Sequence, residues 1–531
     1  MKKLIFVVGF LFYSSMQAQE HNVLFIIADD LGVDALNGYH VVADQATTPH
    51  LDSLRESGLS FLNAWSSPVC TPTRAGMMSG KYGSKTGVKT APGNLDTIHT
   101  SLAKAIKSFD PTYTMGVTGK WHISHPSTEL HPKWHGLDHY AGIMTSGVSA
   151  YDSWDKTEND VTAITTEYAT SFFTDNAISW INAQQSNPWV MWLAHVAPHT
   201  PLHIPPAHMH TQNSTNTNLK KFKAMIESID YEVGRLLDSL STEDKNNLTI
   251  IFIGDNGTSG NLLQGFPAGR GKQTLYEGGI HVPMFVCGKG VTRVGEEDSS
   301  LVNVIDIHAS ILELIGQDLP GGLHNSFSFT PLLTNKNSTS RNYNFTELDA
   351  NGSGITVQGY AIRNKQYKLI KYADNSEEFF DLITDTFELS NLVLGTLNSE
   401  QQAIKDELIA EAQERITSWS CNDGIQNGDE TGIDCGGAKC SPCIPASTSS
   451  IQGEHLLKLF PNPTKNLINV QSGSELIQSI TVRNTLGTTL LQLNSIESKT
   501  ASFSIDNLQP QVLFVSVSVG QFEQVFKVIK E

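Results

Sequence analysis

Strand-like apolar segments recur along the first half of the chain, and polar residues follow each of them at once. The segments are residues 22–28, 113–118, 188–194 and 247–253. Continuous apolar runs of this length are typical of strands that a parallel sheet buries on both faces. The sequence therefore predicts a buried sheet whose strands end in polar residues.

Segments with helical apolar spacing lie between and after these strands. The spacing predicts a helix that starts near residue 48, with Leu51, Leu54 and Leu59 facing inward. Further helices are expected over 101–106, 222–240, 302–314 and 403–419. This alternation favours an α/β fold, with a mostly parallel central sheet and helices on both faces. Strand patterns predict a smaller antiparallel unit over 359–382 and a small all-β sandwich over 456–531.

Composition and charge fit a folded, exported protein. The chain has 531 residues, enough for more than one domain at ~100–200 residues each. Its formal net charge of −18 argues against non-specific binding to nucleic acid or to an anionic membrane surface. Lys2, Lys3 and the apolar stretch 4–12 indicate a signal peptide over residues 1–18. No later stretch approaches the ~18 apolar residues of a membrane span, so we expect no transmembrane segment.

Four of the six cysteines are clustered, and two stand alone. In an oxidising compartment, the cluster predicts two disulfides with three possible connectivities, and zinc binding is the alternative. The cluster comprises Cys421, Cys435, Cys440 and Cys443, within a predicted Cys-rich linker over 421–450. Cys287 follows an apolar stretch and is expected to be buried and inert.

The polar residues after the predicted strands carry chemistry that suits one shared site. Open α/β sheets bind ligands at the carboxyl ends of their strands. The oxygen donors there are Asp29, Asp30, Asp255 and Asn256. Such donors suit a hard cation, Ca²⁺ or Mg²⁺, better than Zn²⁺. The basic residues, which could hold an oxyanion and transfer protons, are Lys120, His122, His199 and Lys272.

Cys70 lies where a loop is expected to lead into a helix, with Pro72 and Arg74 close behind it. A helix N-terminus and Arg74 would both favour negative charge there, which would make Cys70 a nucleophile. The alternative is that this lone cysteine is a small buried hydrophobic residue. A thiolate is a poor ligand for a hard metal ion, which suggests that residue 70 acts as something other than a thiol.

The motifs, taken in order, resemble those of the type I, formylglycine-dependent sulfatases. They are Asp29-Asp30, Cys70-Thr71-Pro72-Thr73-Arg74 with Met78-Ser79-Gly80, Gly119-Lys120-Trp121-His122, Pro198-His199-Thr200-Pro201, Gly254-Asp255-Asn256-Gly257 and Lys272-x4-Glu277-Gly278-Gly279. Residues 381–392 resemble the family's C-terminal subdomain, so the likeness covers roughly residues 20–420. One departure is Ile280-His281-Val282-Pro283, where the family often has Arg.

The resemblance implies a sulfuric ester hydrolase with an alkaline-phosphatase-like core. A separate maturating enzyme would convert Cys70 to formylglycine. One oxygen of its hydrate would attack sulfur, and the other would drive release of sulfate. The implied ligands of one Ca²⁺ ion are Asp29, Asp30, residue 70, Asp255 and Asn256.

The resemblance also implies roles for the basic residues. Arg74 and Lys120 would stabilise the ionised hydrate, and His122 would take the remaining hydroxyl proton. His199 and Lys272 would bind sulfate oxygens, one of them helping the leaving oxygen. Residues 195–210 hold further histidines that could share the role of His199, which is preferred because it lies in the Pro-His-x-Pro block. A histidine zinc site there lacks supporting ligand spacing.

The C-terminal region carries a second resemblance. Leu459-Phe460-Pro461-Asn462-Pro463, followed by strands, resembles the sorting domain of the type IX secretion system, whereas a carbohydrate-binding or adhesion sandwich is the competing interpretation. The expected segments are a signal peptide (1–18), a catalytic α/β domain (19–330), a C-terminal subdomain (331–420), a linker (421–450) and a sorting domain (451–531).

These features together predict a secreted or cell-surface sulfatase, exported through the periplasm. The expected partners are a sulfated carbohydrate substrate, a formylglycine-generating enzyme and the type IX machinery, with no nucleic acid. The rival functions are a phosphonate or phosphate ester hydrolase on the same fold and a non-catalytic glycan-binding protein. Substrate choice is expected to depend on loops 34–46, 125–160 and 200–220.

Overall fold

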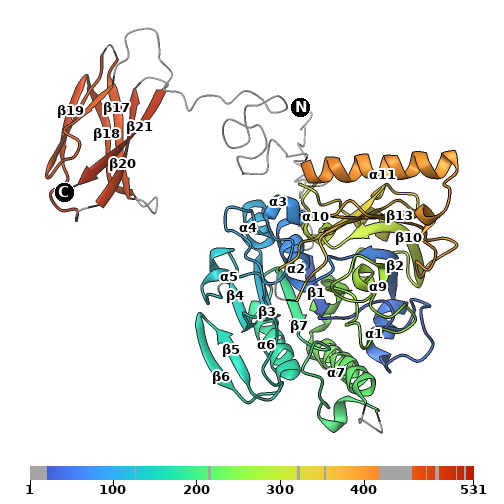
Figure 1. Ribbon diagram of the computed structural model, residues 1–531. Coiled ribbons are helices and arrows are strands. Elements are labelled where there is room, and N and C mark those ends of the chain that lie inside the picture. Colours follow the sequence, from blue (N-terminus) through green and yellow to red (C-terminus); the bar gives the residue numbers. More distant parts are fainter. Residues whose placement is uncertain are drawn as a thin grey trace, which may run out of the picture. The chain divides into compact units, whose positions relative to one another are not determined.

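The computed structural model describes residues 21–125, 127–212, 217–319, 323–351, 354–417, 457–473, 475–484, 489–509, 511–519 and 522–530. The chain divides into two compact units, Met1–Ser441 and Pro442–Glu531, which are described separately (Figure 1). The predicted signal peptide and the 421–450 linker, with its expected disulfides or zinc site, lie outside the described residues.

A ten-stranded sheet forms the centre of the first unit (Figure 1). Its strands are β1 (Asn22–Ala28), β2 (Gly58–Trp65), β3 (Thr114–Lys120), β4 (His139–Ile143), β5 (Trp154–Glu158), β6 (Val161–Thr165), β7 (Trp189–His195), β8 (Leu248–Gly254), β9 (Met284–Gly288) and β10 (Glu296–Asn303). Their order across the sheet is β10-β2-β9-β8-β1-β7-β3-β4-β5-β6. The strands from β8 to β4 in this order are mutually parallel, so their carboxyl ends share one edge.

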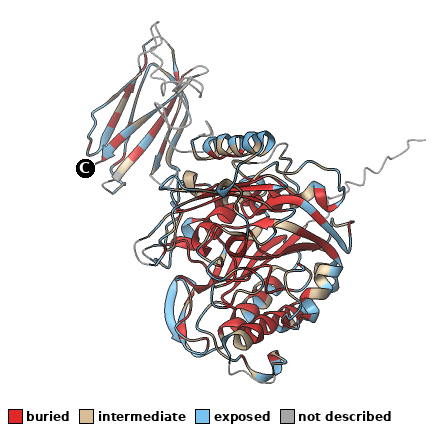
Figure 2. Cartoon of the chain, turned by 45° about the vertical axis from the view of Figure 1, so that its right-hand side comes forward, coloured by how far each residue is buried: buried red, intermediate tan, exposed pale blue. Residues whose placement is uncertain are grey.

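Helices cover both faces of this sheet. They are α1 (Pro49–Glu56), α2 (Cys70–Ser79), α3 (Gly83–Thr86), α4 (Leu102–Phe109), α5 (His131–Trp134), α6 (Ala169–Gln184), α7 (Asn218–Ser239), α8 (Thr242–Asn247), α9 (Glu277–Ile280) and α10 (Asp306–Leu314), with 3-10 turns η1 (Ala207–Met209) and η2 (Thr330–Leu333). Because side chains alternate along a strand, Val23, Phe25 and Ile27 of β1 enter a core shared with α2, α4 and α10. Leu24 and Ile26 enter the opposite core, with α1, α6 and α7. Burial on both faces explains the continuous apolar run (Figure 2).

A four-stranded antiparallel sheet completes the first unit, as expected for the smaller subdomain. It comprises β11 (Asn344–Leu348), β12 (Gly359–Arg363), β13 (Tyr367–Tyr372) and β14 (Glu377–Asp381), in that order. The turn η3 (Leu392–Leu394) and the helix α11 (Ser399–Thr417) follow. Leu408 and Ala412 of α11 are buried, while much of its surface stays exposed (Figure 2).

The second unit is a β-sandwich, which confirms the prediction for the C-terminal region. Its strands are β15 (Lys458–Phe460), β16 (Leu467–Gln471), β17 (Ile477–Asn484), β18 (Thr489–Ser498), β19 (Thr500–Ser504), β20 (Gln511–Val519) and β21 (Phe522–Lys530). They form two antiparallel sheets, β15-β16-β19 and β18-β17-β20-β21. Ile468 and Phe503 from one sheet share a core with Val482 and Val515 from the other.

Two details of the sequence interpretation were wrong. The helix predicted over 302–314 begins only at Asp306, because Val302 and Asn303 end β10. Leu59, expected on the helix that starts near residue 48, is buried on β2 instead. In both places the apolar residues of a strand and of the adjacent helix follow one another closely in the sequence, so their combined spacing resembles that of a single helix. Among the described residues, no helix has the length and apolar character needed to span a membrane.

Candidate active site

Polar residues from distant parts of the chain meet at the carboxyl edge of the parallel strands. Asp29 and Asp30 follow β1, and Asp255 and Asn256 follow the adjacent strand β8. Lys120 ends β3, on the other side of β7. The backbone N–H of Asp255 donates to the Ala28 carbonyl at 3.1 Å, which aligns the two acidic segments.

Cys70 is the first residue of α2, as the sequence predicts, and the whole helix is buried. Its Sγ lies 3.2 Å from His122 Nδ1. Burial raises the pKa of the Cys70 thiol, but the positive charges of Lys120 and Lys272 outweigh burial and lower the pKa overall. The surroundings therefore favour negative charge at residue 70.

Asp29, Asp30 and Asp255 are each paired with a cation. Lys120 Nζ lies 2.5 Å from Asp29 Oδ2, and Lys272 pairs with Asp30 Oδ1. Arg74 donates to Asp255 Oδ2 through Nε at 3.0 Å and Nη2 at 2.8 Å. Arg74 Nη1 also donates to the Lys120 carbonyl at 2.7 Å, which ties α2 to the end of β3.

Pairing affects the two adjacent aspartates differently. Burial raises the pKa of Asp29 to about 6, although Lys120 opposes that rise. Burial also acts to raise the pKa of Asp30, but Lys272, His199 and Lys120 outweigh it, so the pKa falls well below its ordinary value. Asp30 is therefore held firmly as a carboxylate, and the same ion pair raises the pKa of Lys272 against its burial.

Two buried oxygens at the centre of this site have no hydrogen-bond partner in the structure, namely Asp29 Oδ1 and Asn256 Oδ1. The amide of Asn256 is oriented by its Nδ2, which donates to Asp30 Oδ1 at 2.8 Å and to the Gly257 carbonyl at 3.0 Å. Ligand atoms of Asp29, Cys70 and Asp255 lie within 4.8 Å of one another. Buried oxygens without partners are costly, so this donor set fits a hard cation.

The two histidines of the site have defined tasks. His199 Nδ1 lies 2.8 Å from the Thr200 carbonyl, so Nδ1 carries a proton, and Nε2 lies 3.9 Å from Asp30 Oδ2. Burial, with the nearby positive charges of Lys120 and Arg74, holds the pKa of His122 well below its ordinary value. His122 is therefore a neutral imidazole beside Cys70 and can accept a proton.

Backbone geometry also marks the site. Asp30 (φ 67°) and His122 (φ 53°) adopt the left-handed conformation that non-glycine residues rarely take. Gly119 has φ 105°, and a Cβ there would lie 1.9 Å from the Ala194 carbonyl oxygen, so only glycine fits beside β7. Such strained turns after strands are common where side chains are aimed at a ligand.

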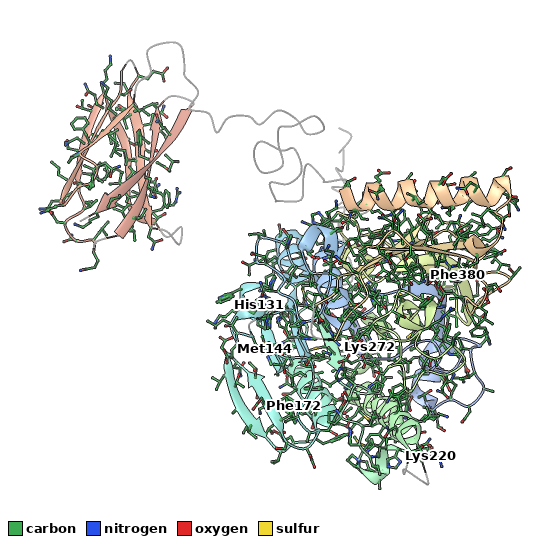
Figure 3. The ribbon with its side chains drawn as sticks, in the orientation of Figure 1. His131, Met144, Phe172, Lys220, Lys272 and Phe380 are labelled. Atoms are coloured by element: carbon green, nitrogen blue, oxygen red, sulfur yellow. The ribbon has the colours of Figure 1, made fainter. Side chains whose placement is uncertain are left out.

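A cavity of about 450 Å³ opens onto these residues. It is lined by Cys70, His122, His199 and Lys272 and by neutral polar residues that include Ser124, Ser127, Thr145, Ser146, Gln273 and Asn351. The predicted loop 125–160 therefore contributes to this cavity. None of the described residues of loops 34–46 and 200–220 lines it, whereas Ala91, Pro92 and Ile355 do. Figure 3 labels Lys272 near the centre of the unit.

Sequence reasoning missed the residues that support the Lys272 loop. Lys368 Nζ on β13 lies 3.1 Å from Glu277 Oε1 and 2.7 Å from Glu388 Oε1. The Glu277 backbone N–H donates to Glu388 Oε2 at 2.7 Å. The family resemblance of residues 381–392 could have drawn attention to Glu388, but no sequence feature pointed to Lys368. His281, in the block where the sequence departs from the family pattern, lies 3.2 Å from Glu277 Oε2 and joins this network.

The other histidines of residues 195–210 and Cys287 lie outside the site. His195 is fully buried on β7, and the His203 ring stacks on Tyr151 with centroids 4.1 Å apart. The possible metal clusters among the described residues include no histidine of 195–210 other than His199. Cys287 is buried, and burial raises the pKa of its thiol to about 12, as expected for an inert residue.

Three family models match the chain. One described as "Sulfatase" matches residues 21–317. A second, "N-sulphoglucosamine sulphohydrolase, C-terminal", matches residues 270–417. The third, "Secretion system C-terminal sorting domain", matches residues 458–531 and indicates secretion or export to the cell surface.

Curated relatives and solved structures agree with these matches. The uncharacterized sulfatase YdeN of Escherichia coli (strain K12) is 25% identical over 441 residues, or 70% of this chain and 78% of that protein. Arylsulfatase J of Mus musculus is 28% identical over 325 residues, or 56% of this chain and 52% of that protein, so the chain spans about half its length.

The solved structures confirm the predicted fold class. Ps i-CgsB in complex with k-i-k-neocarrahexaose has a TM-score of 0.64 at 24% identity, covering 77% of this chain and 94% of that one. BT4656 in complex with its substrate D-glucosamine-2-N,6-O-disulfate has a TM-score of 0.62 at 18% identity, covering 77% and 100%. At these identities the likeness concerns the fold alone.

Proposed function

Because the chain belongs to the sulfatase family and is a sulfuric ester hydrolase, we propose that it cleaves sulfate esters of glycans with residue 70 as formylglycine and with bound calcium. The observation that carries this proposal is the pair of unpartnered buried oxygens, Asp29 Oδ1 and Asn256 Oδ1, close to Cys70. A structural ion-pair network has no need for such atoms, whereas a Ca²⁺ site does.

Residue 70 supplies the nucleophile in this proposal. Cys70 Sγ marks the position that the two hydroxyl oxygens of a formylglycine hydrate would take. One oxygen attacks sulfur while the bond between sulfur and the ester oxygen breaks, which leaves sulfate on residue 70. His122, 3.2 Å away, then accepts the proton of the second hydroxyl as the aldehyde reforms and sulfate departs. Water restores the hydrate.

The cations around residue 70 stabilise the charge that develops. Lys120 and Arg74 favour an ionised oxygen there, and Lys272 holds the sulfate oxygens by charge. Because Nδ1 donates to the Thr200 carbonyl, His199 can give a proton from Nε2 to the departing ester oxygen only as the imidazolium, a form that the Asp30 carboxylate favours although burial lowers the pKa of the ring. Ca²⁺, held by Asp29, Asp30, residue 70, Asp255 and Asn256, would supply further positive charge that polarises the sulfate group.

The substrate class and the export route are part of the same proposal. The solved structure of Ps i-CgsB is a complex with k-i-k-neocarrahexaose, and that of BT4656 holds its substrate D-glucosamine-2-N,6-O-disulfate. The neutral polar lining of the cavity near Lys272 suits sugar hydroxyls. The C-terminal unit directs the chain to the secretion system. We infer that residues 1–18 are a signal peptide and that export passes through the periplasm, with the segment boundaries given above.

Paired aryl esters test the reaction class. The full chain, produced together with a formylglycine-generating enzyme, is expected to release sulfate from p-nitrophenyl sulfate far faster than phosphate from p-nitrophenyl phosphate. Cys70→Ser is expected to stop turnover, because a serine sulfate ester has no second oxygen with which to expel sulfate. Faster phosphate release would support the rival phosphoesterase, and full activity of the serine variant would refute the hydrate mechanism.

A further inference from the structure

A second cavity adjoins the cavity at Cys70. Its volume is about 350 Å³, and it shares His125 and Ser127 with the first cavity. Its other lining residues are Asn94, Asp96, Thr97, Thr128, His131 and Trp134. A ligand longer than one sugar unit, held by its sulfate near Lys272, can therefore continue past His125 and Ser127 into the second cavity.

Trp134 gives this cavity an exposed aromatic surface. The residue closes α5 and is 50% exposed, whereas most other tryptophans of the described residues are buried or half-buried. Aromatic rings offer a large, rigid apolar face on which the C–H face of a sugar ring can stack. The His131 ring contacts Trp134 edge-on, with centroids 6.4 Å apart.

The support beneath Trp134 is tied to the catalytic strand. Trp121 Nε1 donates to His131 Nδ1 at 2.9 Å, so His131 Nε2 carries its proton and donates to the Leu95 carbonyl at 3.1 Å. Trp121 lies between Lys120 and His122 in the chain. In Figure 3, His131 lies on the side of the unit where α5 and β4 lie, with Lys272 nearer the centre. The aromatic surface is thus held in a fixed position relative to residue 70.

The two cavities differ in the charge of the residues that line them. Lys272 lines the first, whereas the described lining of the second contains no Lys or Arg and includes the carboxylate of Asp96. The Ile98 backbone N–H donates to Asp96 Oδ1 at 2.9 Å, which orients the carboxylate and leaves Oδ2 for another donor. A sulfated or carboxylated sugar would be repelled there, while the hydroxyls of an uncharged sugar would find an acceptor.

We propose that the second cavity is a subsite for an uncharged sugar joined to the sulfated one. The uncharged ring stacks on Trp134, and its hydroxyls bind Asp96 and Asn94. The inference rests on the proposed function, because a glycan must occupy the first cavity. It narrows the substrate class to glycans in which the sulfated unit has an unsulfated neighbour.

Matched pairs of substrates test this subsite. Each pair is a monosaccharide sulfate and the disaccharide that adds one unsulfated sugar, with galactose, fucose, N-acetylglucosamine or N-acetylgalactosamine as the sulfated unit. At least one disaccharide is expected to exceed its monosaccharide in kcat/KM by roughly tenfold. Trp134→Ala is expected to raise KM for the disaccharide and so to remove most of its advantage over the monosaccharide. Trp134→Phe, which keeps an aromatic ring, is expected to restore part of that advantage. Phe109→Ala is the control, because Phe109 is 41% exposed and lines neither cavity.

Binding gives a readout that does not depend on turnover. Calorimetric titration of the Cys70→Ala chain with the same pairs should show disaccharides binding roughly tenfold more tightly, and only while Trp134 is present. Equal affinities and equal rates within every pair would overturn the subsite. Failure of the unmutated protein to hydrolyse p-nitrophenyl sulfate, with tighter disaccharide binding retained, would instead refute the proposed reaction and leave the subsite standing.

Discussion

Two buried charge clusters among the described residues of the first unit resemble each other in composition and differ in completeness. The catalytic cluster comprises Asp29, Asp30, Arg74, Lys120, Asp255 and Lys272, and the support cluster comprises Glu277, Arg363, Lys368 and Glu388. In both clusters, buried carboxylates are paired with Lys or Arg side chains. The catalytic cluster lines a cavity, and its Asp29 Oδ1 and the neighbouring Asn256 Oδ1 have no hydrogen-bond or ion-pair partner. In the support cluster Glu388 Oε1 also lacks a hydrogen bond, but it lies 2.7 Å from Lys368 Nζ.

The difference teaches that buried ion pairs alone do not identify a site. Lys368 is enclosed by two carboxylates and by the Trp65 ring, whose centroid is 5.0 Å from Nζ. Nothing in that arrangement can receive a substrate. The support cluster instead holds the Lys272 loop in place, because Glu388 accepts from the Glu277 N–H and Arg270 donates to the Glu388 carbonyl.

Replacing the nucleophile should give the largest effect on activity. Cys70→Ala is expected to lower kcat/KM for p-nitrophenyl sulfate by at least about 10³-fold with little change in Tm, because the helix keeps its packing. Cys287→Ala removes the other buried free cysteine of the described residues and should keep activity. Equal losses in the two variants, measured by steady-state kinetics, would show that activity does not depend on residue 70 specifically.

Breaking the support cluster should mainly affect stability. Lys368→Met leaves two buried carboxylates without their shared cation and is expected to lower the free energy of unfolding by roughly 3–5 kcal/mol. Lys371→Met, on the same strand, removes a half-exposed ion pair with Glu377 and should cost at most about 1 kcal/mol. Denaturant titration measures both, and equal costs would remove the distinction between buried and exposed pairs.

Calcium should act on the catalytic cluster alone. Adding Ca²⁺ at about a hundred times its Kd is expected to stabilise the metal-depleted protein by roughly 2.7 kcal/mol and to restore activity lost to a chelator. Asp29→Asn should weaken this thermal shift, whereas Glu277→Gln in the support cluster should retain it. A shift of the same size in the Asp29 variant would place the ion elsewhere.

Measured over one pH unit, the smallest predicted effect is a pH dependence of stability at Glu388. Burial, aided by the Glu277 carboxylate and opposed by Lys368, raises the pKa of Glu388 from 4.5 to about 7. The folded state therefore binds more protons than the unfolded state between these values, so stability falls as the pH rises through this window. The unmutated protein should lose up to about 1.4 kcal/mol per pH unit relative to Glu388→Gln. The control Glu414→Gln, at an exposed position, should show the same change of stability with pH as the unmutated protein. If Glu388→Gln also shows that change, the raised pKa of Glu388 is contradicted.

The sequence was sufficient for the α/β core and for the set of residues that meet at its edge. Strands such as 22–28 are buried on both faces, so their apolar pattern is unambiguous, and parallel pairing brings their polar ends together. The hairpin of β5 and β6 escaped prediction because its β6 side chains are mostly exposed and carry no clear alternation.

Other features depend on tertiary contacts that no local pattern records. Lys368 looks like a surface lysine on an antiparallel strand, yet it is fully buried because Glu277 and Glu388 arrive from distant segments. Trp134 and Asp96 join one cavity only after folding. Whether Asp29 Oδ1 has a hydrogen-bond partner likewise depends on the positions of all neighbouring donors, which only the folded structure gives.

The most direct test of the central claim is the mass of the tryptic peptide that ends at Arg74, measured beside activity. With a formylglycine-generating enzyme present, we expect the sulfur of residue 70 to be replaced by an aldehyde oxygen. Sulfate release should rise in proportion to the fraction converted. Full activity in protein whose Cys70 remains an unmodified thiol would contradict the account.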